Sequence, residues 1–169
     1  MNAETLAEPT THAAPRPEVD VEAEYVRERG KPLPGFKHSY CQANLIGQLL
    51  PNREFQTLSE LNLDLGGWRS VPDLCVFPRH MNDKIEDQIW VTEVPAIAVE
   101  IISPSQSLDD MFDKVNKLIA GGVPSVWLVL PAVGVISIFQ KNLPFISATQ
   151  GTLTDPGTGI VINVDEVFA

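Results

Sequence analysis

The stretch from Ala96 to Pro131 constrains the fold of this chain more than any other. It begins with an apolar run at residues 96–102 that only Glu100 interrupts, and such runs are typical of strands covered on both faces. Pro104 ends this strand because proline cannot donate to a sheet ladder. A second apolar run follows at residues 125–130. Two strands joined by a helical crossover should lie parallel in one sheet.

The segment between these two strands has the spacing of an amphipathic helix. Ser107 is the expected N-cap, with Asp110 three residues later, and the Gly121–Gly122 pair should end the helix. At about 100° per residue, Lys114 falls at the border of the apolar stripe and Lys117 lies opposite to it. We therefore expect Lys114 to present its amine near the sheet and Lys117 to lie in water. The stripe itself comprises Leu108, Met111, Phe112, Val115, Leu118 and Ile119.

The remaining pattern predicts an α/β (α+β) fold with a mixed sheet flanked by helices in the core order αβββαβ. Residues 1–17 are rich in Ala, Thr, Glu and Pro and lack periodicity, so we expect a disordered acidic leader followed by a single domain at 18–169. The other expected elements are a helix at 38–50, strands at 55–65 and 68–77 joined by a turn at Gly66–Gly67, a strand at 134–139, edge strands or loops at 143–148 and 159–164, and a helical turn at 165–168.

Composition narrows the class of protein. With 169 residues, the chain is long enough for one domain with a substantial core. It has no apolar run of about 18 residues and no visible signal peptide, so we expect a cytoplasmic protein without a membrane anchor. Cys41 and Cys75 are far apart in sequence, which favours two buried thiols. The net charge of −10 argues against a protein that coats nucleic acid non-specifically, although bound divalent cations would change the local sign.

Three residues form a candidate catalytic constellation: Asp73 and Glu100 on neighbouring strands, and Lys114 on the crossover helix. Two carboxylates in a low-dielectric place repel each other, and a divalent cation removes that repulsion. Mg²⁺ takes one or two carboxylates together with water and phosphate oxygens, and it lowers the pKa of a bound water. A lysine beside the cation can position that water and stabilise the charge of the transition state. The pattern therefore indicates metal-dependent phosphodiester hydrolysis.

The motifs VPDLCVF, VEIISPSQSLDDMFDK and GGVPSVWLVLP resemble the signature of the Uma-type (Uma two) restriction endonuclease family, a bacterial branch of the PD-(D/E)XK nuclease superfamily. The resemblance covers roughly residues 18–168 and implies a restriction-endonuclease-like core. It implies Asp73 and Glu100 as ligands of Mg²⁺ or Mn²⁺ and Lys114 as the catalytic lysine. In the wider superfamily the lysine lies two residues after the glutamate, where this chain has Ile102.

The resemblance also indicates two additional site residues and some departures. Glu24 is a candidate third carboxylate because Glu22-Ala23-Glu24 stands where the family has Asp-Gly-Glu, and its alternative is an exposed acid in an acidic leader. His38 matches the family's histidine at the start of the first helix, where a hydrogen-bonding role is the alternative to catalysis. Leu130 replaces a frequent acidic residue, and Leu118 replaces a frequent aromatic residue.

Each of the three main residues also has a purely structural interpretation. Glu100 could be a strand-end residue that faces solvent or pairs with an arginine. Asp73 could be a turn residue after Pro72, and Lys114 could pair with Asp110. Two function hypotheses follow: an endonuclease acting on DNA, or a catalytically inactive nuclease fold that serves protein–protein interaction or regulation. Cleavage of RNA is a third alternative, and a homodimer stays open because two strands need two sites.

Overall fold

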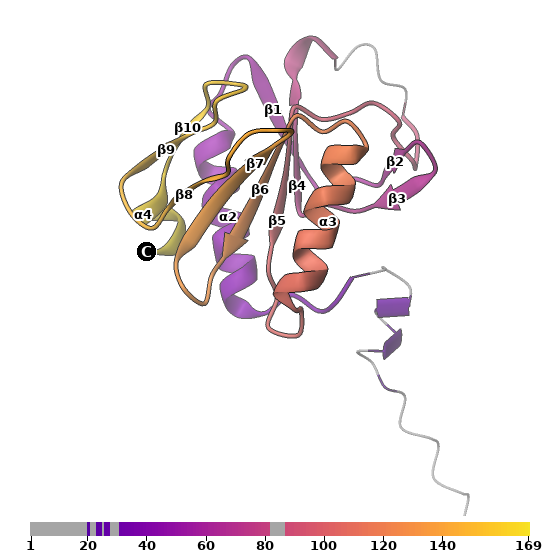
Figure 1. Cartoon of the computed structure of the whole chain (residues 1–169), viewed down its shortest axis with the longest axis horizontal. Coiled ribbons are helices and arrows are strands. Elements are labelled where there is room, and N and C mark those ends of the chain that lie inside the picture. Colours follow the sequence, from indigo (N-terminus) through magenta and orange to yellow (C-terminus); the bar gives the residue numbers. More distant parts are fainter. Residues whose placement is uncertain (1–19, 21–22, 25, 28–30, 82–86) are drawn as a thin grey trace, which may run out of the picture.

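The computed structural model describes residues 20, 23–24, 26–27, 31–81 and 87–169. Its centre is a six-stranded mixed sheet with the strand order β1-β4-β5-β6-β7-β8 (Figure 1). Its parallel pair is β5 with β6, and the other neighbours are antiparallel. The sheet strands are β1 (Phe55–Ser59), β4 (Leu74–Pro78), β5 (Ile97–Ile101), β6 (Ser125–Leu130), β7 (Val135–Gln140) and β8 (Ile146–Ala148).

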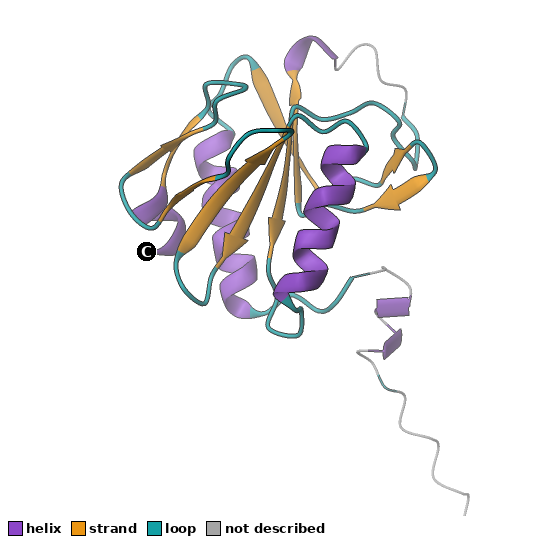
Figure 2. Ribbon diagram, viewed as in Figure 1, coloured by secondary structure: helices purple, strands orange, loops and turns teal. Residues whose placement is uncertain are grey.

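Helices α2 (Phe36–Leu49) and α3 (Leu108–Ala120) cover opposite faces of this sheet (Figure 2). Alternate strand residues feed two separate cores, as the period of two in a strand requires. The α2 core contains Cys41, Leu45, Leu49, Leu74, Val76, Val99, Ile101 and Trp127, among others. The α3 core contains Met111, Val115, Leu118, Cys75, Phe77, Ala98, Val126 and Leu128, among others.

The predicted strand–helix–strand unit is confirmed. Strands β5 and β6 are parallel, with Ile97 opposite Ser125. Helix α3 begins after the N-cap Ser107, whose hydroxyl oxygen accepts from the Asp110 amide at 3.1 Å. The helix ends at Gly121 and Gly122, and Gly122 has a φ of +101°, which suits glycine because it lacks Cβ.

Two long predicted strands are wrong as single elements. The predicted strand 55–65 is divided into β1 and β2 (Leu63–Leu65), and Glu60 between them has a φ of +54°. The predicted strand 68–77 is divided into β3 (Trp68–Ser70) and β4. Strands β2 and β3 form a separate two-stranded sheet around the expected Gly66–Gly67 turn. Only residues 61–65 alternate strictly, so the apolar pattern by itself did not mark either break.

The C-terminal segment adds a second small sheet of β9 (Thr152–Thr154) and β10 (Val161–Asn163), followed by helix α4 (Val164–Phe168). The sequence indicated β10 and α4 but not β9.

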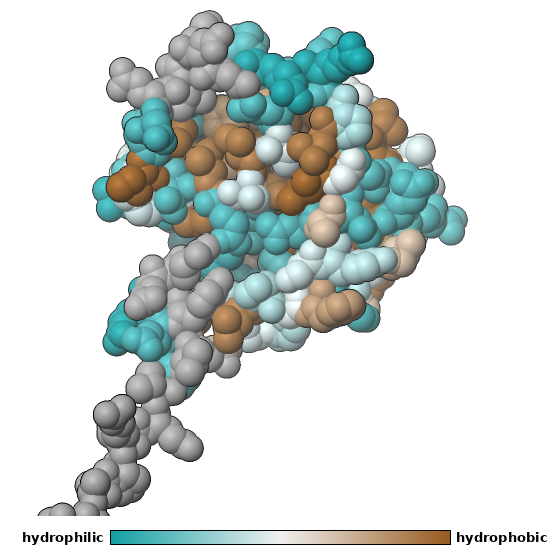
Figure 3. Space-filling view, turned by 180° about the vertical axis from the view of Figure 1, so that it is seen from behind, coloured by the Kyte–Doolittle hydropathy of each residue, from teal (hydrophilic) through white to brown (hydrophobic). Residues whose placement is uncertain are grey.

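From behind, hydrophobic and hydrophilic patches alternate on the surface (Figure 3). Cys41 and Cys75 are buried free thiols, as expected. Over the described ranges no helix is long and apolar enough to cross a membrane. The predicted leader at 1–17 lies outside the described residues.

Candidate active site

Sheet register places Asp73 and Glu100 opposite each other. Asp73 directly precedes β4, in which Leu74 pairs with Val99 of β5, so the next antiparallel pair is Asp73 with Glu100. Both side chains line one small cavity, Glu100 from β5 and Asp73 from the residue before β4. The first two predicted site residues therefore converge from adjoining strands.

Asp73 is held as an ionised carboxylate. Its Oδ2 accepts a hydrogen bond from the Ile101 amide at 2.7 Å, and its Oδ1 accepts one from Lys31 Nζ at 2.7 Å. His38 Nε2 lies 3.5 Å from the same Oδ1. Burial alone would raise the pKa of Asp73, but the His38 hydrogen bond and the charge of Lys31 outweigh burial and lower the pKa to about 2. This carboxylate therefore stays ionised throughout the neutral range.

Glu100 is buried beside Asp73, but its pKa is shifted in the opposite direction. Its side chain is 2% exposed, and its Oε2 accepts a hydrogen bond from Lys114 Nζ at 2.7 Å. Burial raises the pKa of Glu100; Lys114 opposes that rise and the charge of Asp73 adds to it, giving a value of about 7. Its Oε1 is buried and has no hydrogen-bond partner within the described part of the chain. A buried oxygen of this kind costs free energy unless a ligand satisfies it.

Lys114 lies where the helical angle predicts, with a side chain that is 23% exposed. Its amine also lies 3.5 Å from the carbonyl oxygen of Val71. The alternative pair with Asp110 does not form, since the Asp110 carboxylate accepts from the Ser107 hydroxyl at 2.6 Å. Lys117 is exposed, as expected. The ammonium of Lys114 therefore reaches Glu100 from the helix that covers this face.

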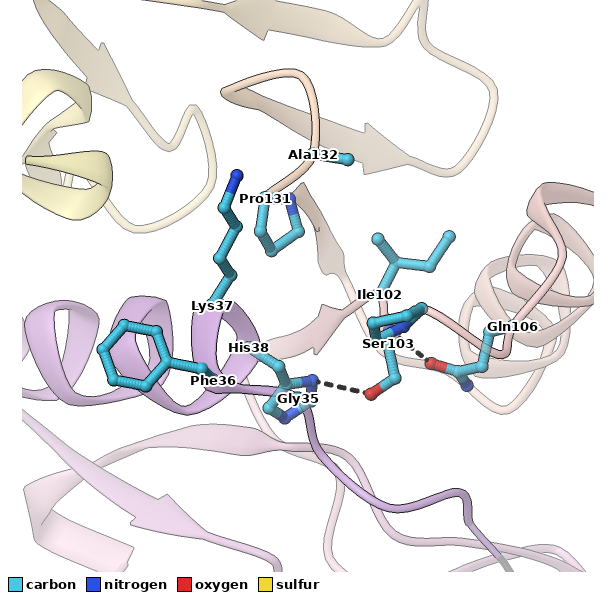
Figure 4. Close-up of a pocket in the computed structure, with 10 residues that line it drawn as sticks. Gly35, Phe36, Lys37, His38, Ile102, Ser103, Gln106, Pro131 and Ala132 are labelled. Carbon is cyan, nitrogen blue, oxygen red and sulfur yellow. Dashed lines mark hydrogen bonds between the residues drawn. The ribbon is translucent and has the colours of Figure 1, made fainter.

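The two additional candidates have different positions. His38 is buried, and its Nδ1 lies 3.1 Å from the Ser103 hydroxyl (Figure 4). Its Nε2 lies 3.5 Å from Asp73 Oδ1, so this ring connects Ser103 to Asp73. Glu24 is partly exposed and forms an ion pair with Arg27 at 3.5 Å. Glu24 does not line the cavity between the carboxylates. The structure therefore brings His38 to the site and leaves Glu24 away from it.

Lys31 and Ser103 are site residues that the sequence reasoning missed. Lys31 lies in the connector before α2, and its amine contacts both Asp73 and Glu60. Burial favours the neutral amine, but the charges of these two acids outweigh it and raise the pKa of Lys31. The available signal was a lysine next to Pro32 and seven residues before His38. For Ser103, the available signal was the adjacent Pro104, because this proline ends the strand.

A small cavity separates these side chains and holds about 10 Å³, close to the space for one water. Two larger hollows adjoin it. One is a polar groove of about 360 Å³ between the β2–β3 hairpin and α3, and the other is a largely apolar pocket of about 470 Å³ that includes His38 and Ser103 (Figure 4). The cavity lining is Lys31, Pro32, His38, Asp73, Glu100, Ile101, Ser103, Gln106 and Lys114.

The donor set fits a hard divalent cation. No group of three or more His, Cys, Asp or Glu side chains suited to a metal occurs among the described residues. Mg²⁺ needs only one or two carboxylates and takes its other ligands from water and phosphate. Asp73 and Glu100 supply two carboxylates, and the Oε1 of Glu100, which has no hydrogen-bond partner among the described residues, is an oxygen that could bind the cation.

Comparison with known proteins gives this chain a family and a similar fold. The chain matches the Uma2 family, described as "Putative restriction endonuclease", over residues 12–162. It is similar to the crystal structure of a putative nuclease belonging to DUF820 from Anabaena variabilis, with 21% identity, a TM-score of 0.69, and coverage of 82% of this chain and 83% of that chain.

A cryo-EM structure of a DrdV–DNA complex is far less similar, with 10% identity, a TM-score of 0.35, and coverage of 66% of this chain and 9% of that chain. No curated protein matches the chain significantly. The Anabaena structure supports the predicted restriction-endonuclease-like fold, and the family match spans most of the sequence. The chain belongs to the Uma2 family of putative restriction endonucleases.

Proposed function

We propose that this protein is a metal-dependent endonuclease that hydrolyses phosphodiester bonds in DNA, with Asp73 and Glu100 binding Mg²⁺ or Mn²⁺ and Lys114 assisting the attacking water. The observation that carries the proposal is the meeting of two buried carboxylates beside one ammonium, with the Oε1 of Glu100 left without a partner in the described structure. Family membership supports the same reaction class.

Each residue has a distinct part in this chemistry. A bound divalent cation would lower the pKa of a water and neutralise charge on the scissile phosphate. Asp73 is fixed by the Ile101 amide and stays ionised, so it needs no deprotonation before it binds. Glu100 releases its proton near neutral pH. The Lys114 ammonium, 2.7 Å from Glu100, can hold a water and stabilise negative charge on the phosphate.

Substrate would reach the site through the polar groove. The cavity itself is too small for a nucleotide, and the groove shares Lys31 and Lys114 with it. The groove is also lined by Ser70, whose buried hydroxyl oxygen has no hydrogen-bond partner within the described residues. Phosphate oxygens can accept from such donors. The charged lining residues are Lys31, Arg69, Lys114, Lys117, Asp110 and Asp113.

The test is nicking of supercoiled plasmid in Mg²⁺, in Mn²⁺ and in EDTA. We expect cleavage in either metal, none in EDTA, and a loss of at least about 100-fold in Glu100→Gln and Asp73→Asn, since each removes a charged metal ligand. Asp165→Asn, an exposed acid at the start of α4, should keep wild-type activity. Cleavage that survives Glu100→Gln, or no cleavage with any metal, contradicts the proposal.

One observation favours the second candidate, an inactive nuclease fold that binds a protein partner. Both carboxylates already carry a lysine, and the whole chain has a net charge of −10. Thermal unfolding with Mn²⁺ separates the two candidates, because a ligand that binds the folded state raises Tm. A Tm increase that Asp73→Ala abolishes identifies a working metal site, whereas an unchanged Tm favours the binding module.

A further inference from the structure

Lys31 enters the cavity from a different direction than Lys114 and binds the other carboxylate. Its ammonium lies 2.7 Å from Asp73 Oδ1 and 2.9 Å from Glu60 Oε1, and its side chain is only 11% exposed. Both contacts are charge-assisted hydrogen bonds in a poorly hydrated place, where they are stronger than surface ion pairs. Lys31 is therefore a buried, hydrogen-bonded component of the candidate site.

Lys31 and Lys114 differ in which carboxylate oxygens they leave accessible to a metal ion. Lys114 occupies Glu100 Oε2 and leaves the neighbouring Oε1 open. Both oxygens of Asp73 already accept a hydrogen bond, Oδ2 from the Ile101 amide and Oδ1 from Lys31, with His38 Nε2 3.5 Å from Oδ1. A cation that binds Asp73 therefore meets the oxygen that Lys31 already holds.

We infer that the Lys31 ammonium competes with the divalent cation for Asp73 Oδ1, so that cation binding shifts Lys31 from Asp73 to Glu60. This inference rests on the proposed function only in taking Asp73 and Glu100 as the metal ligands. Glu60 at 2.9 Å gives the displaced ammonium a charged partner, which makes the exchange less costly than stranding a buried charge. Without metal, Lys31 instead neutralises the Asp73 carboxylate.

The first test measures Mn²⁺ affinity without DNA by isothermal titration calorimetry. Lys31→Met keeps most of the stem and removes the competing charge, so we expect Mn²⁺ to bind at least about tenfold more tightly, or about 1.4 kcal/mol. Lys117→Met removes the same charge from the adjoining groove without touching a cavity carboxylate, so its effect should be less than about threefold. Equal or weaker binding by Lys31→Met overturns the inference.

A second measurement uses the wild-type chain and does not depend on whether Lys31→Met folds. The ¹⁵N resonance of the Lys31 ammonium, assigned with Lys31→Arg, should shift as Mg²⁺ saturates the site, because its bond to Asp73 is lost. An unchanged resonance at saturation overturns the competition.

The two proposals fail in different ways. If neither the wild-type protein nor Lys31→Met binds Mn²⁺, the proposed metal site and the proposed competition are both wrong. If Lys31→Met binds Mn²⁺ more tightly but the wild-type chain cuts no plasmid, the nuclease proposal falls alone and the competition stands.

Discussion

Glu100 lies fully buried between Lys114 and Asp73, and this setting makes its carboxyl group a pH-dependent contributor to stability. Its pKa is raised from 4.5 to about 7 in the folded state, so its stabilising contribution is complete below pH 4.5 and is lost as pH rises through 7. The lowered pKa of Asp73 acts between pH 3.8 and about 2, outside that window. We expect Glu100→Gln to flatten the fall in the free energy of unfolding between pH 4.5 and 7, measured by urea denaturation in metal-free buffer.

Glu54→Gln is the matched control because Glu54 is exposed, so its stability profile should follow that of the wild type. A Glu100→Gln profile parallel to the wild-type profile across this range would mean that burial does not raise the pKa of Glu100 in the folded protein. The same residue illustrates what the sequence could tell: one acid in an apolar run marked the site, but the run could not show which oxygen Lys114 would bind.

Lys31 shows why part of the site could not be predicted. Helical and strand periodicity located Asp73, Glu100 and Lys114, since each lies on or next to a regular element. Lys31 lies in a proline-containing connector without periodicity, 42 residues from Asp73, and only the folded path of that connector brings the two together. Glu24 shows the reverse case: a loose motif match made this partly exposed residue a candidate, but it does not line the cavity.

At the scale of elements, the sequence predicted the strand–helix–strand unit well because its signals are local: apolar runs, an N-cap and a glycine stop. The breaks that separate β1 from β2 and β3 from β4 depend on tertiary pairing, since β1 pairs with β4 while β2 pairs with β3. Strand β9 (Thr152–Thr154) is a further element that the sequence did not indicate. Its position depends on one buried acid, Asp155, in the loop between β9 and β10.

Asp155 joins the β9–β10 ribbon to β6. It is 0% exposed, and its carboxylate accepts from Ser125, from Trp127 Nε1 at 2.9 Å and from the amides of Gly157 and Thr158. Asp155→Ala leaves several buried donors without an acceptor, so we expect a loss of about 3 kcal/mol or more in the free energy of unfolding, measured by urea denaturation.

Asp165→Ala makes the same truncation at an exposed acceptor for Gly151 and should cost about 1 kcal/mol or less. Because Asp155 lies outside the cavity, Asp155→Ala should still bind Mn²⁺ wherever it remains folded. Equal losses in the free energy of unfolding of the two variants would show that Asp155 stabilises the fold no more than an exposed acceptor does.

At the scale of the whole molecule, a net charge of −10 leaves few places where a polynucleotide can bind. The polar groove carries four of the basic side chains, so no more than about four phosphates are neutralised there. We therefore expect the logarithm of the duplex-DNA association constant to fall with the logarithm of salt concentration at a slope no steeper than about −4. Anisotropy of a short labelled duplex, in buffer with Ca²⁺ as an oxygen-binding cation, measures this slope.

Two of those four bases can be removed without touching the carboxylates of the cavity. In the double variant Arg69→Gln/Lys117→Gln, the slope should become shallower by about 2, because each phosphate contact contributes about 0.9. Arg53→Gln/Lys141→Gln removes the same two charge types from exposed positions outside the groove and should leave the slope unchanged. If both double variants change the slope equally, DNA responds to overall charge and the groove is not its path to Asp73 and Glu100.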